Sequence, residues 1–127
     1  INTSVTVNYQ SEIFDQGADY NTSTSVFTAP VTGRYFFQAC LIFGNPQTDA
    51  TYIEFAIDTS NRNYSIALND YDAFDQNTVY WAVNGSCFAD MDAGDTANAR
   101  VYQAGGTAST SIYNSPEGAR FSGYLVC

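Results

Sequence analysis

Hydrophobic residues along the chain recur with a two-residue period, which is the spacing of a β-strand rather than of a helix. The clearest example follows Gly33, where the run RYFFQACLIF contains few polar side chains. As a strand, one face of this run would carry Tyr35, Phe37, Ala39, Leu41 and Phe43, and the other Phe36, Gln38, Cys40 and Ile42. No segment keeps a 3.6-residue period over three turns, so the pattern predicts an all-β domain.

Short runs rich in β-forming residues, separated by turn residues, predict where the other strands lie. Gly44-Asn45-Pro46 and Gly105-Gly106 are typical of such turns. We expect strands at roughly 3–9, 12–14, 25–29, 33–43, 51–58, 63–68, 78–89, 97–103 and 119–126. A series of short strands of this kind is typical of a β-sandwich or a barrel.

Three of the predicted strands place large apolar side chains on both faces: 33–43, 78–89 and 119–126. A sheet built from such strands cannot leave either side in water. We therefore expect one sheet to be buried twice, once against the partner sheet of its own domain and once against another molecule.

Length and charge limit the classes of partner. The 127 residues suffice for a single domain over 1–127, and because the first residue is Ile1 rather than methionine, we expect a piece of a longer chain. Thirteen carboxylates face four arginines, with no lysine or histidine, which gives a net charge of −9. This charge disfavours nucleic acid and anionic membranes as partners, and no apolar run reaches the roughly 20 residues that span a bilayer.

The residues usually found in catalytic sites are scarce. A serine or cysteine nucleophile needs an activating base, and the chain has no histidine or lysine. Paired carboxylates are expected by chance among so many acids, so we predict that the protein is not an enzyme. We interpret Cys40, Cys87 and Cys127 as thiols acting mainly as small hydrophobic groups, with a Cys40–Cys87 disulfide as the alternative.

The spacing of one set of aromatic residues resembles the signature of the C1q family, the globular head of complement C1q and its tumour-necrosis-factor-like relatives. The signature positions are filled by Tyr9, Asp15, Tyr20, Phe27, Gly33, Tyr35 and Phe37. Tyr9 stands where the family usually has Phe, and Ala39 where it usually has a last aromatic residue. The segments ADMDAGDTANARV (89–101) and FSGYLV (121–126) are similar to a turn and to the closing strand of the family.

The resemblance implies a ten-stranded jelly-roll β-sandwich that assembles as a homotrimer. In the family, the strands equivalent to 33–43, 78–89 and 119–126 form an inner sheet along the threefold axis, so the second partner would be two more copies of the chain. The residues that this implies for the trimer interface or the inner sheet are Tyr35, Phe36, Phe37, Cys40, Ile42, Trp81, Tyr124 and Val126.

Two long loops, 69–77 and 104–118, combine aromatic side chains with acids and amides. Such combinations suit the binding of sugars or protein epitopes, because apolar area is offered together with hydrogen-bonding groups. The candidate ligand-binding residues are Tyr71, Asp72, Phe74, Asp75, Tyr113 and Asn114. In the alternative interpretation, the aromatic rings fold back onto the edge of the sandwich.

Two groups of aspartates suggest a site for calcium, which prefers oxygen ligands. Asp70, Asp72 and Asp75 crowd one loop, and Asp90, Asp92 and Asp95 surround a turn. Neither group fits an EF-hand loop, because Phe74 follows Asp72 at the next alternate position. Solvated aspartates that form turns are the alternative, and we predict no other cofactor.

These observations favour a non-catalytic homotrimeric head, located extracellularly or on a virion surface, that recognises a glycan or protein ligand on cells. The distal tip of a viral or phage fibre is the setting we favour. The alternatives are a purely structural trimerisation or virion decoration domain, and a secreted C1q-like or cytokine-like ligand.

Overall fold

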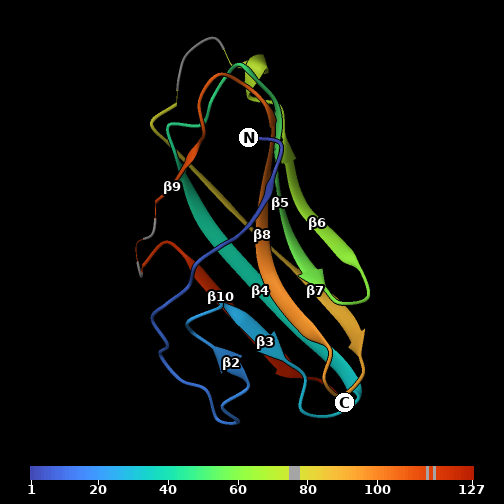
Figure 1. Ribbon diagram of the computed structural model, residues 1–127. Coiled ribbons are helices and arrows are strands. Elements are labelled where there is room, and N and C mark those ends of the chain that lie inside the picture. Colours follow the sequence, from blue (N-terminus) through green and yellow to red (C-terminus); the bar gives the residue numbers. More distant parts are fainter. Residues whose placement is uncertain (75–77, 114, 116) are drawn as a thin grey trace.

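The computed structural model describes residues 1–74, 78–113, 115 and 117–127. Ten strands in these residues form two antiparallel sheets, packed face to face as a β-sandwich (Figure 1). The two termini lie toward opposite ends of the sandwich, with the C-terminus at the bottom of Figure 1. The all-β sandwich expected from the two-residue period is therefore confirmed.

The first sheet contains six strands. Five of them lie in the order β2 (Tyr20–Asn21), β3 (Val26–Thr28), β8 (Thr96–Gly105), β5 (Ala50–Thr59) and β6 (Asn63–Asn69). The sixth, β1 (Ser4–Thr6), pairs with residues 100–102 of β8, further along the same edge that β3 occupies. The pairs β2–β3 and β5–β6 join consecutive strands, whereas β8 pairs with β1, β3 and β5, which lie far from it in the sequence. Such long-range connections are typical of a jelly roll.

The second sheet carries the features that matter for function. Its order is β10 (Arg120–Leu125), β4 (Gly33–Gly44) and β7 (Tyr80–Met91), and β9 (Ser111–Tyr113) pairs with the end of β4. The three segments predicted to be apolar on both faces thus lie side by side in one sheet. The long central strand β4 pairs with β7 along its whole length, from Gly33 opposite Met91 to Gly44 opposite Tyr80.

The alternation predicted for β4 is confirmed by burial. The face directed into the sandwich is at most 2% exposed and consists of Tyr35, Phe37, Ala39, Leu41 and Phe43. On the opposite face, Phe36, Cys40 and Ile42 are half-buried and Gln38 is exposed. One side of β4 therefore completes the core of the domain, and the other side faces away from it.

The prediction was wrong at several places where strands are short. Residues 12–14 form no strand, the N-terminal strand covers only Ser4–Thr6, and β2 and β9 were not expected. The Asp15 carboxylate accepts hydrogen bonds from the backbone N–H groups of Gly17 (3.2 Å) and Tyr20 (2.8 Å). These bonds close a turn after residue 14, and the only helical element of the described residues is the 3-10 turn η1 (Tyr71–Ala73).

One aromatic cluster ties the N-terminal segment to both sheets. The ring of Phe121 in β10 stacks on Phe37 (5.6 Å between centroids) and lies 6.2 Å from Tyr9 and 6.0 Å from Tyr20. Phe27 meets Phe37 edge to face at 5.4 Å. Because such rings bury large areas in defined geometries, this cluster fixes how the first 30 residues cover the sandwich.

Gly33 allows β4 to begin close to the C-terminal segment. A Cβ atom on this residue would lie 2.7 Å from the carbonyl oxygen of Cys127 and 2.7 Å from Leu125 Cδ1. The backbone of Arg34 also donates to Cys127 O (2.8 Å) and accepts from Val126 N (2.7 Å). Only glycine fits this approach without displacing the chain that follows β10.

Candidate functional site

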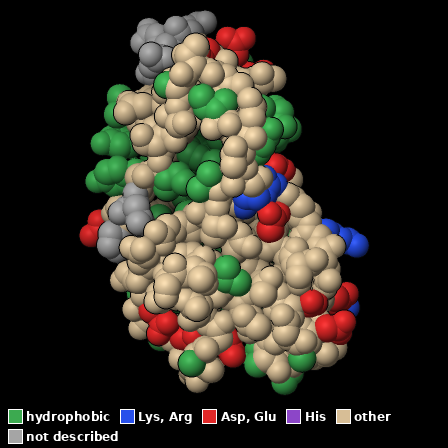
Figure 2. Space-filling model, viewed as in Figure 1, with side chains coloured by type: hydrophobic (Ala, Val, Ile, Leu, Met, Phe, Trp, Pro, Cys, Tyr) green, Lys and Arg blue, Asp and Glu red, His purple; other side chains and the backbone are tan. Residues whose placement is uncertain are grey.

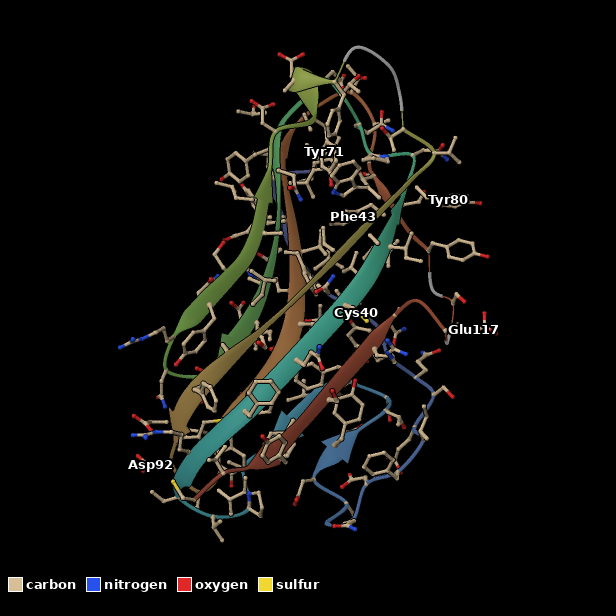
Figure 3. All side chains as sticks on the ribbon, turned by 180° about the vertical axis from the view of Figure 1, so that it is seen from behind. Cys40, Phe43, Tyr71, Tyr80, Asp92 and Glu117 are labelled. Carbon is tan, nitrogen blue, oxygen red and sulfur yellow. The ribbon has the colours of Figure 1, made fainter. Side chains whose placement is uncertain are left out.

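The strongest candidate for a functional surface is the face of the β10–β4–β7 sheet that points away from the core, called here the outer face. Figure 3 looks toward this side of the molecule, with β7, β4 and β10 crossing in front. Strand register places its side chains in rows that run across three strands. The outer face consists of Arg34, Phe36, Gln38, Cys40, Ile42, Tyr80, Ala82, Asn84, Ser86, Phe88, Asp90, Tyr113, Arg120, Ser122 and Tyr124.

An aromatic row crosses the outer face near the C-terminal end of the molecule. Phe36 lies between Phe88 on β7 and Tyr124 on β10, with ring centroids 5.2 Å and 5.4 Å away. Phe88 is 58% exposed and Tyr124 60% exposed. Three rings in mutual contact that still expose more than half of two side chains form an apolar patch that no described residue of this chain covers.

A second aromatic group lies at the other end of the outer face. Tyr80 at the start of β7 meets Tyr113 of β9 edge to face at 5.4 Å, and both are about half exposed. Tyr113 is opposite Ile42 in the strand register. Figure 2 shows hydrophobic side chains gathered in the upper half of the molecule, on the side where β9 lies.

Between these two groups runs a polar belt. Ser122, Gln38 and Ser86 share one row, and Arg120, Cys40 and Asn84 share the next. The outer face therefore alternates along the sheet between apolar, polar and apolar zones. Such a mixture of aromatic anchors and hydrogen-bonding groups is typical of protein–protein interfaces rather than of a domain core.

Not all residues predicted for the interface lie on this surface. Tyr35 and Phe37 belong to the inner sheet but point into the core, where each is at most 2% exposed. Trp81 also points toward the sandwich, because it is paired with Phe43 in the register. Val126 lies just beyond β10, whereas Phe36, Cys40, Ile42 and Tyr124 lie on the outer face.

The predicted ligand-binding residues do not form one surface. Tyr71 is completely buried and packs on Phe43, Trp81 and Phe74, so its ring is part of the core and not available to a ligand. Phe74 is half-buried against Trp81 at 5.0 Å. Trp81 and Tyr80 are neighbours in β7 and point to opposite faces, so Phe74 and Tyr113 lie on opposite sides of the sheet. Asp72 is exposed, and Asp75 and Asn114 lie outside the described residues.

Two of the aspartates proposed as calcium ligands, Asp70 and Asp95, form turns, whereas Asp90 lies in β7 and pairs with Arg34. Asp70 caps η1 by accepting from the backbone N–H of Asp72 at 3.1 Å. Asp95 accepts from Asp92 N, Ser60 Oγ and Asn61 Nδ2, and these hydrogen bonds, the one from Asp92 above all, lower the pKa of its carboxyl. In residues 1–74, 78–113, 115 and 117–127, no three acidic or sulfur groups gather as a metal site.

The strands of Cys40 and Cys87 are neighbours, but the two thiols are not paired. Cys87 is opposite Phe37 and faces the core side, whereas Cys40 is opposite Asn84 on the outer face. Both are free, as is the exposed Cys127, so the disulfide alternative is wrong. Burial raises the pKa of the Cys87 thiol to about 11, which keeps it protonated and unreactive near neutral pH.

Sequence reasoning missed a pocket at the edge of the sandwich where β6 and β7 approach each other. It has a volume of about 240 Å³ and is lined by Arg34, Asn61, Arg62, Tyr64, Phe88 and Asp90. These residues come from three separate stretches of the chain. The pairing of β4 with β7 and the packing of β6 beside β7 bring them together, and no local motif could have indicated them.

Comparison with known proteins identifies the family. The family model for the C1q domain matches residues 1–126. The chain belongs to the C1q domain family. No curated protein sequence matches it significantly.

Solved structures confirm the C1q/TNF-type sandwich. The globular domain of zebrafish complement 1qA protein is similar with a TM-score of 0.69 and 19% identity, over 96% of this chain and 84% of that chain. Murine APRIL at pH 8.5 is similar with a TM-score of 0.66 and 13% identity, over 96% and 85% of the two chains. At these identities the likeness concerns the fold.

Members of the C1q family share a general role. C1q and TNF-like domains are non-enzymatic recognition domains that form homotrimers and bind ligands or receptors, and they are typically secreted or extracellular. Within the described residues of this C1q domain, no helix is long and apolar enough to cross a membrane. The signature residues of the C1q domain have clear roles here, since Tyr9, Tyr20, Phe27 and Phe37 build the aromatic cluster and Gly33 permits the close approach described above.

Proposed function

We propose that this C1q domain is the non-catalytic homotrimeric head of a longer protein and recognises a ligand on the surface of cells. The observation that carries the proposal is the exposed aromatic row of Phe36, Phe88 and Tyr124 on the outer face. A second copy of the same face, or of its edge at β7, offers apolar groups that would remove these rings from water.

Energetics favour assembly. Burial of apolar surface yields about 25 cal/mol per Å², so several hundred Å² per protomer are worth on the order of 10 kcal/mol before the costs of association. Three copies each carry a net charge of −9. Exposed charges farther apart than about 8–10 Å are largely screened at physiological salt, so hydrophobic burial outweighs the repulsion.

We assign ligand contact to the end of the molecule that carries η1 and β9, opposite the C-terminus (Figure 1). Among the described residues that the sequence predicts to bind a ligand, Asp72 and Tyr113 are the exposed ones at this end. Phe74 lies at the same end but on the opposite side of the sheet from Tyr113, with its half-buried ring against Trp81. Tyr71 supports this end from within, because its buried ring packs on Phe43, Trp81 and Phe74.

The setting that we propose is the distal tip of a viral or phage fibre, where a compact trimer would end a long shaft. The acidic, lysine-free composition suits an exposed head that avoids nonspecific attachment to anionic cell surfaces. A secreted C1q-like ligand is the other setting for the same trimer. The sequence preceding Ile1 distinguishes them, since Gly-X-Y repeats belong to a collagenous stalk and β-rich or coiled-coil repeats to a fibre.

A trimerisation domain without a ligand is the second candidate function. It is favoured by the burial of Tyr71 and the contact of Phe74 with Trp81, which use loop aromatics for packing rather than for binding. The two functions differ in the role of exposed groups at that end. A trimerisation domain without a ligand needs none of these exposed groups, whereas a recognition head loses contacts with its ligand when they are removed.

The test is attachment of the fluorescently labelled domain to a panel of cells that includes the suspected hosts. We expect wild-type trimer to attach, and Asp72→Ala and Tyr113→Ala to weaken attachment while sedimentation still reports a trimer. Thr6→Ala in β1, on the other sheet, is the control and should attach normally. A trimer that attaches to no cell in the panel would support the trimerisation domain without a ligand instead. Attachment that is unchanged in both variants would support it equally.

A further inference from the structure

The loop that joins Tyr9 to Tyr20, called here the Phe14 loop, carries the two most exposed large apolar side chains of the described residues. Ile13 is 81% exposed and Phe14 is 82% exposed. The loop begins and ends beside β10, because the rings of Tyr9 and Tyr20 lie 6.2 Å and 6.0 Å from Phe121. Two apolar side chains are therefore presented to water next to the edge that β10 forms in the β10–β4–β7 sheet.

Hydrogen bonds within the Phe14 loop fix its shape. The Asp15 carboxylate accepts from the backbone N–H groups of Tyr20 and Gly17, and these bonds, the one from Tyr20 above all, lower the pKa of its carboxyl. Glu12 is exposed, and within the described residues its carboxylate forms no ion pair. The loop thus holds an apolar side chain and an available carboxylate in a defined position, which lowers the entropic cost of binding a partner.

The pocket where β6 approaches β7 lies at the opposite edge of the same sheet, because β10 and β7 are the outermost strands on either side of β4. Its volume is about 240 Å³, and its walls include the rings of Tyr64 and Phe88. An apolar cavity of about 150 Å³ is large enough to bind benzene, so this pocket has room for the ring of a phenylalanine.

Arg62 is the available cation of this pocket. The other arginine of the lining, Arg34, is paired with Asp90 at 3.1 Å, whereas the guanidinium of Arg62 forms no ion pair within the described part of the chain. The backbone N–H of Arg62 donates to Thr59 Oγ1 at 3.0 Å, and its carbonyl oxygen accepts from Thr59 N at 2.8 Å. The pocket therefore offers aromatic walls and a positioned guanidinium, which complement an apolar ring with a carboxylate near it.

The Phe14 loop and the pocket lie on opposite sides of the molecule. In Figure 1 the chain that leads into β2 lies at the lower left, and the turn between β5 and β6, which carries Arg62, lies at the right below the middle. Figure 3, which shows the molecule from behind, places the two segments at opposite sides again. Complementary surfaces on opposite sides of one chain form head-to-tail contacts between copies, and a threefold rotation closes such contacts into a ring.

A second copy of the chain is the occupant that the surroundings of the pocket favour. Phe88 belongs both to the pocket and to the aromatic row of Phe36, Phe88 and Tyr124, so a copy that covers the row also reaches the pocket. At the other edge, the Phe14 loop adjoins β10, which carries Tyr124. The loop and the pocket are thus the two ends of one band across the outer face.

We propose that Phe14 of one copy inserts into the β6–β7 pocket of the next copy, where Glu12 of the first pairs with Arg62 of the second. Phe14 packs against Tyr64 and Phe88, which removes its own ring and part of Phe88 from water. The Glu12 carboxylate supplies the acid that Arg62 lacks within its own chain. The proposal rests on the proposed homotrimer and adds to it one loop-in-pocket contact at each boundary between copies.

The experiment measures how fast donor-labelled and acceptor-labelled trimers exchange subunits, followed by fluorescence energy transfer. Phe14→Ala should accelerate exchange by about tenfold or more, because each boundary loses its aromatic anchor. Val5→Ala, at a 53% exposed site on β1 of the other sheet, is the control and should stay within about twofold of wild type. Circular dichroism of Phe14→Ala should remain that of a β-sandwich, since Phe14 is not part of the core.

Exchange of the two charges tests the pairing. Glu12→Arg and Arg62→Glu each place like charges at the contact, and both should accelerate exchange by about tenfold. Overall charge would act differently, because Glu12→Arg makes the chain less negative and would then slow exchange. The double variant restores opposite charges and should return to within about threefold of wild type.

Failure of this contact is separable from failure of the trimeric head. A wild-type trimer whose exchange is unchanged in Phe14→Ala, or a double variant no slower than the single ones, overturns the contact and leaves the homotrimer standing. Unchanged exchange with weaker attachment to cells in Phe14→Ala would assign the Phe14 loop to the cell ligand and also overturn the contact. A single-chain mass for the wild type overturns the trimeric head, and the contact with it.

Discussion

Phe36 and Phe88 lie 5.2 Å apart across β4 and β7, yet Phe88 keeps 58% of its surface exposed. Phe37 is the residue after Phe36 in β4, and its side chain points into the core, where it is 1% exposed. The same strand therefore carries two layers of aromatic residues, one covered by the partner sheet and one uncovered. The uncovered layer is what a second copy of the domain would bury.

The first prediction is that the uncovered aromatic layer does not tolerate a charged side chain. Phe88→Asp would place a carboxylate in the proposed contact between copies, where an unpaired charge costs several kcal/mol (~3–5). Sedimentation velocity should report a monomer or an aggregate instead of a trimer. Circular dichroism should remain that of a β-sandwich, because Phe88 is not part of the core.

Val5→Asp is the control for this variant. Val5 lies on β1 in the other sheet and is 53% exposed, which is close to the exposure of Phe88. The Val5→Asp variant should sediment with the same trimer mass as the wild type. If Phe88→Asp sediments as a stable trimer, the aromatic row of Phe36, Phe88 and Tyr124 is not the contact surface.

The second prediction concerns Gly33. In Gly33→Ala, the new methyl group would meet Cys127 O and Leu125 Cδ1 at 2.7 Å, and relief of that clash should cost about 1–3 kcal/mol of unfolding free energy. In Gly44→Ala, the nearest atom is Ser111 Cβ at 3.6 Å, an ordinary contact, so stability should be unchanged or up to about 1 kcal/mol higher. Urea denaturation of both variants decides this, and equal stabilities would show that the close approach carries no strain.

The third prediction compares a sheltered ion pair with an exposed one. Arg100→Gln leaves the carboxylates of Glu54 and Asp58 without their cation on a side chain that is only 10% exposed, and should cost about 3–5 kcal/mol. Arg34→Gln breaks the pair with Asp90, whose side chains are 56% and 80% exposed, and should change stability far less. Chemical denaturation of both variants provides the comparison; a larger loss in Arg34→Gln would contradict it.

The fourth prediction concerns alkaline pH. Burial raises the pKa of the Cys87 thiol to about 11, whereas an unfolded cysteine titrates near about 8.5. The unfolded state therefore releases its proton first, so stability should hold below about pH 8.5 and fall as the pH rises toward about 11. Cys87→Ser should remove this part of the fall, while Cys127→Ser, at an exposed site, should keep it. Identical pH profiles for wild type and Cys87→Ser would contradict the burial effect.

The sequence predicted best where local pattern and tertiary environment agree. The alternation of β4 placed Phe36 and Phe37 on the correct faces, because a two-residue period leaves no other choice once one side is buried. The hydrophobic pattern gave a wrong prediction at 12–14, where Ile13 and Phe14 are typical of a strand but Asp15 closes a turn instead. Local hydrogen bonds of this kind compete with strand pairing and are not visible in a hydrophobic pattern.

The candidate sites were harder to predict because they depend on long-range packing. Tyr71 sits in a polar loop sequence, yet it is buried because η1 turns it onto Phe43 and Trp81. Arg62 and Phe88 are 26 positions apart in the chain and meet only through the packing of β6 beside β7. Residues such as these acquire a role only after the sheets are assembled.

The most direct measurement is the mass of the purified wild-type domain by sedimentation equilibrium across a range of micromolar concentrations. Closure of the aromatic row of Phe36, Phe88 and Tyr124 by neighbouring copies predicts three times the mass of one chain. A single-chain mass at every concentration, with those rings in water, would contradict it.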